Sequence, residues 1–366
     1  MGHDCVGQPW CPGLGRSPTF DKCAPLWHGQ SADAIYLFLF GLRRDLGLSF
    51  VRYRSRCGHN FGGDGDHERW IDYLAQGAKM KRIACIGEAM IELSTEGDQA
   101  HLAVAGDTLN TAIYLKRSLP DITVDYVTCL GHDMFSNRIV EFIAANDLGH
   151  ANIQRIAHKS PGLYAINTAP DGERSFTYWR SDSAARQMFS DANFHFLEQF
   201  DGLYLSGITL AILPQNLRLA LLEWLHAAPV KVIFDSNYRP HLWEDRATAQ
   251  KIIAAFWQRA DISLPSIDDE MDVFGETEVQ VVQRFLTQAK SGALKRSARG
   301  PLSLGVPVVA QYEPATEVLD TTAAGDSFNG GYLGALLSGK DQAAALQAGH
   351  ALAAQVVQYR GAIIPK

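Results

Sequence analysis

The sequence predicts an α/β fold with a largely parallel central sheet. From Met80 to the C-terminus, short apolar runs alternate with longer segments of helical periodicity. Several of the short runs are apolar throughout, which is typical of strands that are covered by helices on both faces. A regular alternation of such strands and helices is the pattern of a parallel sheet joined by crossover helices.

The composition limits the classes of partner. The chain has 366 residues, of which 46% are hydrophobic and 20% charged, and its net charge of −7 argues against nucleic acid or an anionic membrane as the main partner. No apolar run approaches the ~20 residues of a membrane span, and no basic region followed by an apolar core opens the chain. We therefore expect a cytoplasmic protein. Six irregularly spaced cysteines predict no disulfide framework, and Cys85 and Cys129 are expected to be buried thiols.

Residues 1–79 differ from the rest of the chain. They contain scattered Gly, Cys, Trp, His and Arg without a sustained period of two or 3.6. The cluster from Cys57 to His67 contains metal-ligating residue types, but no strand precedes its glycines and no ligand spacing repeats. We interpret residues 1–79 as an extension that is disordered or arises from an upstream start, with the folded domain at 80–366.

The alternating segments give the expected elements in chain order. Strands are predicted at 82–86, 125–129, 202–205, 231–235, 261–264 and 306–312. Helices are predicted at 109–119, 135–146, 216–226 and 247–259. Two further segments, at about 89–105 and 162–180, interrupt the alternation, and the second predicts a β-hairpin around the turn at Pro170–Glu173.

Polar residues follow several of these elements. Asp107 and Asn110 open a predicted helix, where they could bind substrate hydroxyls, although Asp107 or Thr108 could equally serve as a helix cap. Period two places Tyr178 and Arg180 on one strand face, suited to a hydroxyl or carbonyl and a carboxylate. The alternative is an exposed face with an ordinary arginine.

Two loops follow predicted strands at the edge where α/β proteins bind ligands. Arg239 lies in the first and would contact an anion, although the loop could be a structural turn anchored by Trp243. Two candidate arginines favour an acidic sugar over a neutral one. The second loop contains Asp269 and Glu270, which could hold magnesium through water but could also be a charged helix N-terminus. No direct metal ligand is predicted.

Residues 320–331 predict the start of a helix with an exposed set of amides. Ala323, Ala324 and Gly325 leave the backbone bare, and the spacing of Phe328 and the apolar residues after it begins a buried helical stripe. Such a helix end binds anions. Asp326 within it fits a base that takes a proton from a hydroxyl attacking a γ-phosphate, although it could be only a first-turn acid.

The whole string at 320–331 resembles the second signature of the ribokinase-like (PfkB) sugar kinases, with Ala324 where many members carry glycine. The segments 106–110, 237–243 and 359–365 are similar to the 2-keto-3-deoxygluconate kinases of this family. The resemblance implies a ribokinase-like three-layer α/β/α sandwich with a small β-sheet lid that excludes water on closure. Ser266 and Asp269 stand where related enzymes have an Asn-x-x-Glu motif, and Ser297 replaces a glycine in the stretch that meets the nucleotide.

The implied reaction is ATP-dependent phosphorylation of 2-dehydro-3-deoxy-D-gluconate at the 6-hydroxyl, with Mg²⁺ on the nucleotide and Asp326 as base. Ala323, Ala324, Gly325 and Asp326 would form the anion hole. The implied substrate contacts are Gly106, Asp107, Thr108, Leu109, Asn110, Tyr164, Tyr178, Trp179, Arg180, Arg239 and Asp326. The implied nucleotide contacts are Asn237, Tyr238, Arg239, Lys295, Arg296, Ser297, Gly300, Ala323, Ala324 and Gly325.

Pairing of family members through the lid also implies a homo-oligomer. A ribokinase-like kinase of a neutral sugar such as fructose, or a non-catalytic sugar-acid binding protein, are the alternatives.

Overall fold

The computed structural model describes residues 80–96, 99–168 and 174–366. Its main sheet has seven strands in the order β13-β12-β11-β10-β9-β1-β4. Adjacent strands are parallel except for β12 and β13, which are antiparallel. The strands are β1 (Arg82–Ile86), β4 (Thr123–Val127), β9 (Gly202–Ser206), β10 (Lys231–Asp235), β11 (Ile262–Ser263), β12 (Gly292–Leu294) and β13 (Leu302–Leu304). The expected N-terminal extension and the turn at 170–173 lie outside the described residues.

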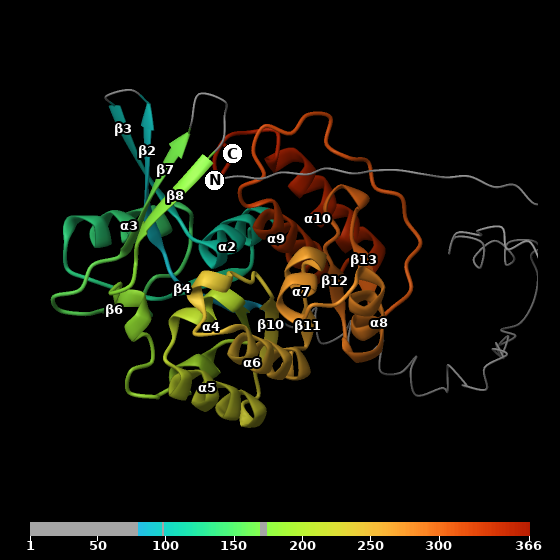
Figure 1. Ribbon diagram of the computed structural model, residues 1–366, viewed down its shortest axis with the longest axis horizontal. Coiled ribbons are helices and arrows are strands. Elements are labelled where there is room, and N and C mark those ends of the chain that lie inside the picture. Colours follow the sequence, from blue (N-terminus) through green and yellow to red (C-terminus); the bar gives the residue numbers. More distant parts are fainter. Residues whose placement is uncertain (1–79, 97–98, 169–173) are drawn as a thin grey trace, which may run out of the picture. The chain divides into compact units, whose positions relative to one another are not determined.

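Helices cover both faces of this sheet, as the apolar strands predicted. Ile83 and Cys85 of β1 pack into one hydrophobic cluster, and Ala84 and Ile86 pack into the other, because successive side chains of a strand point to opposite faces. The first cluster includes residues of α2 (Asp107–Ser118), α3 (Met134–Ala145), α9 (Ala324–Leu337) and α10 (Gln342–Val356). The second includes residues of α5 (Gln215–Ala227), α6 (Arg246–Arg259), α7 (Ile267–Phe274) and α8 (Glu278–Gln288). The α/β architecture with helices on both faces is confirmed (Figure 1).

The two segments that interrupt the alternation form a second sheet of four strands, in the order β3-β2-β7-β8. These strands are β2 (Met90–Glu96), β3 (Gln99–Ala105), β7 (Gly162–Thr168) and β8 (Arg174–Trp179). The predicted hairpin is confirmed, since β7 and β8 are antiparallel, and β2 joins the two hairpins by pairing in parallel with β7. Figure 1 shows this small sheet standing apart from the main one.

The strand predicted at 306–312 is wrong. These residues form no strand, and the last strands of the sheet are β12 and β13, which the sequence analysis did not identify. Pro307 lacks the N–H that a sheet ladder requires, and Val309 is 83% exposed, so its β-branched side chain has no face to pack against. The short strand β12 is formed instead by Gly292, Ala293 and Leu294, because they lie between β11 and β13.

Smaller elements complete the described chain. The strand expected at 125–129 is divided into β4 and β5 (Cys129–Leu130), and β5 pairs with β6 (Gln154–Arg155). The short helix α4 (Gly207–Ile212) follows β9. Cys85 and Cys129 are buried free thiols, as predicted. Among the described residues, no helix combines the length and the apolar character that a bilayer span requires.

Candidate active site

A cavity of about 920 Å³ lies where several strands of the main sheet end. Asp235 is the last residue of β10, Ser266 follows β11, and Lys295 follows β12, and all three line the cavity. The first turns of α2 and α9, residues of the small sheet, residues of α10 and the segment before α9 also line it. The carboxyl edge of a parallel sheet is the usual ligand position in α/β proteins, and the volume suits small ligands.

The N-terminus of α9 opens into this cavity. The helix begins at Ala324, and its first turn has no side-chain cap, so the amides there are available to a ligand. Ala323 has a left-handed backbone with φ of 58°, a conformation that favours glycine. From the sequence, Ala324 was expected to replace a glycine common in the family, but Ala324 is helical. The strained position is Ala323.

Asp326 lies in the first turn of α9 and lines the cavity. Its Oδ2 accepts a hydrogen bond of 2.9 Å from Asn110 Nδ2. Burial, and then the charges of Asp107 and Asp235, raise the pKa of Asp326 to about 8, against the opposing effects of the Asn110 hydrogen bond and the Lys295 charge. A carboxyl group with this pKa is largely protonated at pH 7, and its carboxylate, the form that accepts a proton, predominates above about pH 8.

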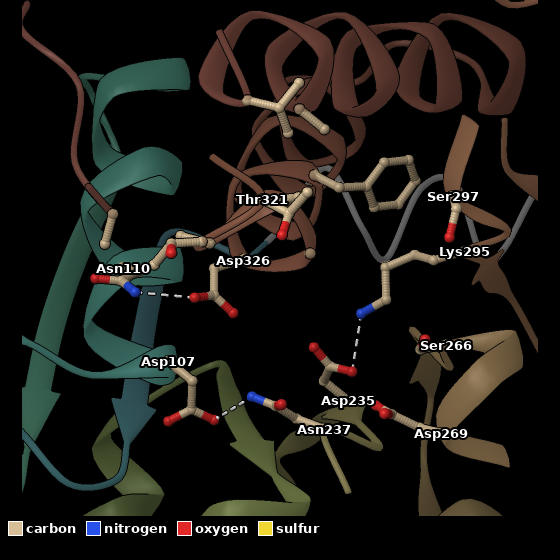
Figure 2. A pocket seen from close by; sticks show the side chains of 18 of the residues that line it. Asp107, Asn110, Asp235, Asn237, Ser266, Asp269, Lys295, Ser297, Thr321 and Asp326 are labelled. Atoms are coloured by element: carbon tan, nitrogen blue, oxygen red, sulfur yellow. Dashed lines mark hydrogen bonds and ion pairs between the residues drawn. The ribbon is translucent and has the colours of Figure 1, made fainter. Parts of the chain in front are cut away.

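Asp107 and Asn237 join the start of α2 to the loop after β10. Asn237 Nδ2 donates to Asp107 Oδ2 at 2.8 Å, and burial raises the pKa of Asp107. The N-cap of α2 is Gly106, without a side-chain cap, so neither Asp107 nor Thr108 acts as the N-cap. Asn110 Oδ1 is buried and has no hydrogen-bond partner among the described residues. Figure 2 shows Asp107, Asn110, Asn237 and Asp326 around a shared space.

A second group of residues, which we name the lid cluster, consists of Glu88, Tyr164, Tyr178, Arg180 and His241. The buried guanidinium of Arg180 forms an ion pair with the buried carboxylate of Glu88, and it lies over the Tyr178 ring, 6.0 Å from its centroid. The hydroxyl of Tyr164 donates to the carboxylate of Glu92, and the rings of Tyr164 and Tyr178 are 5.6 Å apart. Arg180 therefore has a protein counter-ion before any anion binds.

Arg239 and His241 line the cavity from the loop after β10. The Arg239 side chain is 47% exposed and lies 3.6 Å from Asp269 Oδ1. His241 packs against Tyr178 at 5.9 Å between ring centroids, and burial together with the charges of Arg180 and Arg239 lowers its pKa. His241 was not predicted from the sequence to be a site residue. Its position two residues after Arg239, in the same strand exit, was the available signal.

Asp269 and Glu270, the acidic pair proposed for magnesium, lie in different surroundings. Asp269 lines the cavity, and desolvation raises its pKa to about 6. Glu270 is fully buried and does not line the cavity, because its carboxylate accepts from Trp257 Nε1 at 3.1 Å and from Arg284 at 3.0 Å. A charged helix N-terminus, the alternative for this segment, is also present, since α7 begins at Ile267.

The predicted nucleotide stretch brings Lys295, Arg296 and Ser297 to the cavity. Lys295 Nζ lies 2.8 Å from Asp235 Oδ1. Ser297 has a left-handed backbone, with φ of 53°, which explains why glycine suits this position in related sequences. Gly300 is buried and does not line the cavity.

Several predicted contacts do not reach the cavity wall. Thr108 is buried against the Tyr126 hydroxyl at 3.0 Å, Leu109 lies in the core, and Trp179 is 58% exposed. Tyr238 is buried in the second hydrophobic cluster, with residues of α5 to α8. Asp235, by contrast, lines the cavity although the sequence analysis named it only as the end of a strand. Thr108, Leu109 and Trp179 point away from the cavity although their neighbours in the sequence line it, because successive side chains of a helix or strand point in different directions.

The chain resembles known proteins in sequence and in fold. Residues 80–366 match the pfkB family carbohydrate kinase profile. The chain is 43% identical over 303 residues to a 2-dehydro-3-deoxygluconokinase of Dickeya dadantii, a match that covers 78% of this chain and 97% of the relative. It is 41% identical to the protein of the same name from Escherichia coli K12, over 78% of this chain and 98% of the relative.

Among solved structures, a PfkB protein from Polaromonas sp. JS666 superimposes with a TM-score of 0.67 at 27% identity, covering 76% of this chain and 96% of the other. A 2-dehydro-3-deoxygluconokinase from Thermotoga maritima gives a TM-score of 0.66 at 21% identity, covering 77% and 95%, and supports the fold.

Proposed function

Because this chain belongs to the pfkB family of carbohydrate kinases, we propose that it transfers the γ-phosphoryl group of ATP to the 6-hydroxyl of 2-dehydro-3-deoxy-D-gluconate. The products are 2-dehydro-3-deoxy-6-phosphogluconate and ADP. The observation that carries this proposal is the similarity to curated 2-dehydro-3-deoxygluconokinases over nearly their whole length. The ligand cavity adds an independent reason, since it joins a carboxyl group to the amides of a helix start.

Asp326 is the base of this reaction. Its carboxylate takes the proton of the 6-hydroxyl as that oxygen attacks the γ-phosphorus, the bond from the γ-phosphorus to the β–γ bridging oxygen breaks, and ADP leaves. The amides of residues 323–326 stabilise the charge on the transferred group, because donors that are already oriented need no reorganisation during reaction. A carboxyl pKa of about 8 gives Asp326 a high proton affinity for this task.

The sugar acid is held by groups of α2, of the small sheet and of the loop after β10. The unpaired Oδ1 of Asn110 and the carboxylate of Asp107 suit substrate hydroxyls, since a buried acceptor without a partner gains from a bound donor. Arg180 and Arg239 suit the carboxylate of the substrate, and Tyr164 and Tyr178 suit its oxygen atoms at the lid. Because Arg180 is already paired with Glu88, the substrate carboxylate shares this guanidinium rather than neutralising a free charge.

The site also fits ATP with Mg²⁺. The backbone at 323–325 bears no large side chain, and Lys295, Arg296 and Ser297 border the same cavity, so phosphates can approach the amides. Mg²⁺ usually keeps several waters and binds through one or two carboxylates together with substrate phosphates. Asp269, with Asp235 nearby, would hold it, and Glu270 would not. Magnesium would neutralise charge on the phosphates.

The direct test is ADP release by the full chain with 2-dehydro-3-deoxygluconate, gluconate, fructose or ribose as acceptor. We expect the highest kcat/KM with 2-dehydro-3-deoxygluconate. A preference for fructose would refute the assignment of substrate. Binding of the keto-deoxy acid without ADP release would refute catalysis and favour a binding protein.

A further inference from the structure

We propose that Lys295 is a catalytic residue that contacts the phosphoryl group in transfer, and that Asp235 and Asn329 position its ammonium. This inference rests on the proposed kinase function. It assigns a role in the chemical step to Lys295, which the sequence analysis related only to nucleotide binding. It also assigns roles to two buried residues that no sequence argument identified.

Asp235, Asn329 and Lys295 form a closed ring of contacts. Lys295 Nζ lies 2.8 Å from Asp235 Oδ1 and donates to Asn329 Oδ1 at 3.2 Å. Asn329 Nδ2 in turn donates to Asp235 Oδ2 at 2.6 Å. The three residues come from β10, α9 and the end of β12, so the ring fixes the ammonium relative to three elements at once. Asp235 and Asn329 are buried, which protects both contacts from competition by water.

The ring directs Lys295 to the start of α9. A Cβ atom built on Gly325 would lie 3.8 Å from Lys295 Nζ, so the ammonium stands beside the bare backbone of the first turn. Asn329 is three residues after Asp326 and therefore lies on nearly the same face of the helix. Figure 2 shows the Lys295 ammonium and the Asp326 carboxylate on opposite sides of one open space, with Asp235 below Lys295.

The Lys295 ammonium has an N–H donor left for a ligand after its contacts with Asp235 and Asn329. An ammonium has three N–H donors. In the described residues Asn329 Oδ1 accepts a hydrogen bond from it, and Asp235 Oδ1 forms an ion pair with it at 2.8 Å. Its side chain is 12% exposed and lines the cavity, so the third donor can reach a phosphate oxygen. Lysine binds phosphate as a compact point charge, for which an orientation fixed by two protein partners is sufficient.

The charge balance explains why the reaction needs this cation. Asp107, Asp235 and Asp326 bring three carboxylates to the space that an anionic phosphoryl group must enter. Arg239 is turned toward Asp269, and the Nε of Arg296 donates to the carbonyl of Gly300 at 3.1 Å. Among the residues that the structure describes, Lys295 is therefore the cation that lies against both the first turn of α9 and Asp235. An oriented positive charge at this point stabilises the transition state more than the ground state.

The central experiment compares Lys295→Met with Lys340→Met, a control at an exposed lysine outside the cavity. We expect Lys295→Met to lower kcat about 100-fold, the effect of removing one oriented donor, with the KM for 2-dehydro-3-deoxygluconate within about threefold of wild type. Lys340→Met retains wild-type kcat. Thermal melting verifies that both variants fold.

The pH profile tests whether Lys295 and Asp235 act on Asp326 through their charges. The charged and titratable groups around Asp326 are Asp107 and Tyr114 of α2, Tyr204 of β9, Asp235 of β10 and Lys295. Lys295 lowers the pKa of Asp326 and Asp235 raises it. In a kcat/KM profile, Lys295→Met therefore shifts the acid limb to higher pH, and Asp235→Asn shifts it to lower pH. Shifts in the same direction overturn the proposal.

A double-mutant cycle tests whether Asp235 acts through Lys295. Asp235→Asn alone should lower kcat about tenfold, and in the Lys295→Met background it should lower kcat by less than about twofold, because residues that act as a unit are not additive. Asn329→Leu should behave in the same way. Full additivity of either pair overturns the positioning role.

Failure of this inference is distinguishable from failure of the proposed function. If wild-type protein releases no ADP with 2-dehydro-3-deoxygluconate, the proposed function is refuted, and the inference with it. If wild type is active and Lys295→Met retains kcat within about threefold, only the inference is overturned. If Lys295→Met does not fold, the pH profile of Asp235→Asn decides, since an unshifted acid limb overturns the proposal.

Discussion

The two groups of side chains in the cavity handle charge in opposite ways. In the lid cluster, the Arg180 guanidinium is paired with Glu88, and the Tyr164 hydroxyl donates to Glu92. Around the start of α9, three carboxylates face one ammonium, and the pKa of Asp326 is raised to about 8. We name this second group the α9 cluster, consisting of Asp107, Asp235, Lys295, Asp326 and Asn329.

This difference separates recognition from chemistry. A buried pair such as Arg180 and Glu88 is oriented before the ligand arrives, so it can select a substrate by geometry without a free charge in the cavity. An excess of carboxylates raises proton affinity, which a base requires but a binding site does not. We propose from this comparison that charge pairing marks the residues that hold the sugar acid, and that charge excess marks the residues that act on it.

Replacing Asp326 with Asn is the strongest test of the α9 cluster. Asparagine retains the size of the side chain but cannot take the proton, so we expect kcat to fall about 1,000-fold. ATP affinity, measured by calorimetry without sugar, should change little because the amides of α9 remain. A variant with a near-normal rate would show that charge excess does not mark the base.

A buried pair in the lid cluster allows recognition to be separated from stability. Arg180→Met leaves Glu88 buried without its partner, so the free energy of unfolding should fall by about 3–5 kcal/mol. The KM for 2-dehydro-3-deoxygluconate should rise about 10- to 100-fold, from the loss of a charge-assisted hydrogen bond. The double variant Glu88→Gln/Arg180→Met should recover much of the stability in urea unfolding.

The KM of that double variant decides the role of Arg180. If the arginine binds the substrate, KM stays high although stability returns. If KM returns together with stability, the pair has only a structural role, and the lid cluster does not recognise the acid.

The pH dependence of kcat/KM probes the carboxylates of the α9 cluster. The proposed base, Asp326, would act as a carboxylate, and burial raises its pKa to about 8, so activity should rise with pH and level off above that value. Asp107→Asn removes the neighbouring charge that raises this pKa most, and the acid limb should move to lower pH. Glu92→Gln in the small sheet is the matched control, for which we expect no shift. An unmoved limb in Asp107→Asn would contradict charge excess as the cause.

The fold was predictable because burial on both faces gives strands a local pattern. The run of Val232, Ile233 and Phe234, for example, is apolar throughout and lies in the buried strand β10. β12 was missed because a strand of Gly292, Ala293 and Leu294 has no such pattern. The strand wrongly predicted at 306–312 shows the converse, since β-branched residues form a strand only where a neighbour accepts their hydrogen bonds.

The candidate site was predictable only in part. Asp107, Asn110, Lys295 and Asp326 were identifiable because they follow strands or open helices. Their partners were not, because Glu88 lies 92 residues before Arg180, and Asn329 lies 94 residues after Asp235. Such pairs depend on the packing of distant elements, for which a single sequence has no local signal.

The smallest expected effect concerns the backbone of the α9 cluster. The lid cluster is held by side-chain pairs, whereas residues around the α9 cluster have positive φ angles at Asn237, Ser297 and Ala323. A left-handed conformation costs a non-glycine residue about 1–2 kcal/mol, so Ala323→Gly should raise the free energy of unfolding by up to about 1 kcal/mol after the greater chain entropy of glycine is included.

Ala324→Gly is the matched control, because Ala324 is helical and glycine there should lower stability by about 0.5–1 kcal/mol. Urea unfolding of the two variants measures both signs. If both substitutions destabilise the protein, the backbone at Ala323 is not strained. If the free energy of unfolding rises in Ala323→Gly and falls in Ala324→Gly, the start of α9 keeps its exposed amides at a cost in stability. The reason is that the left-handed residue Ala323 leads the chain into the uncapped first turn of the helix.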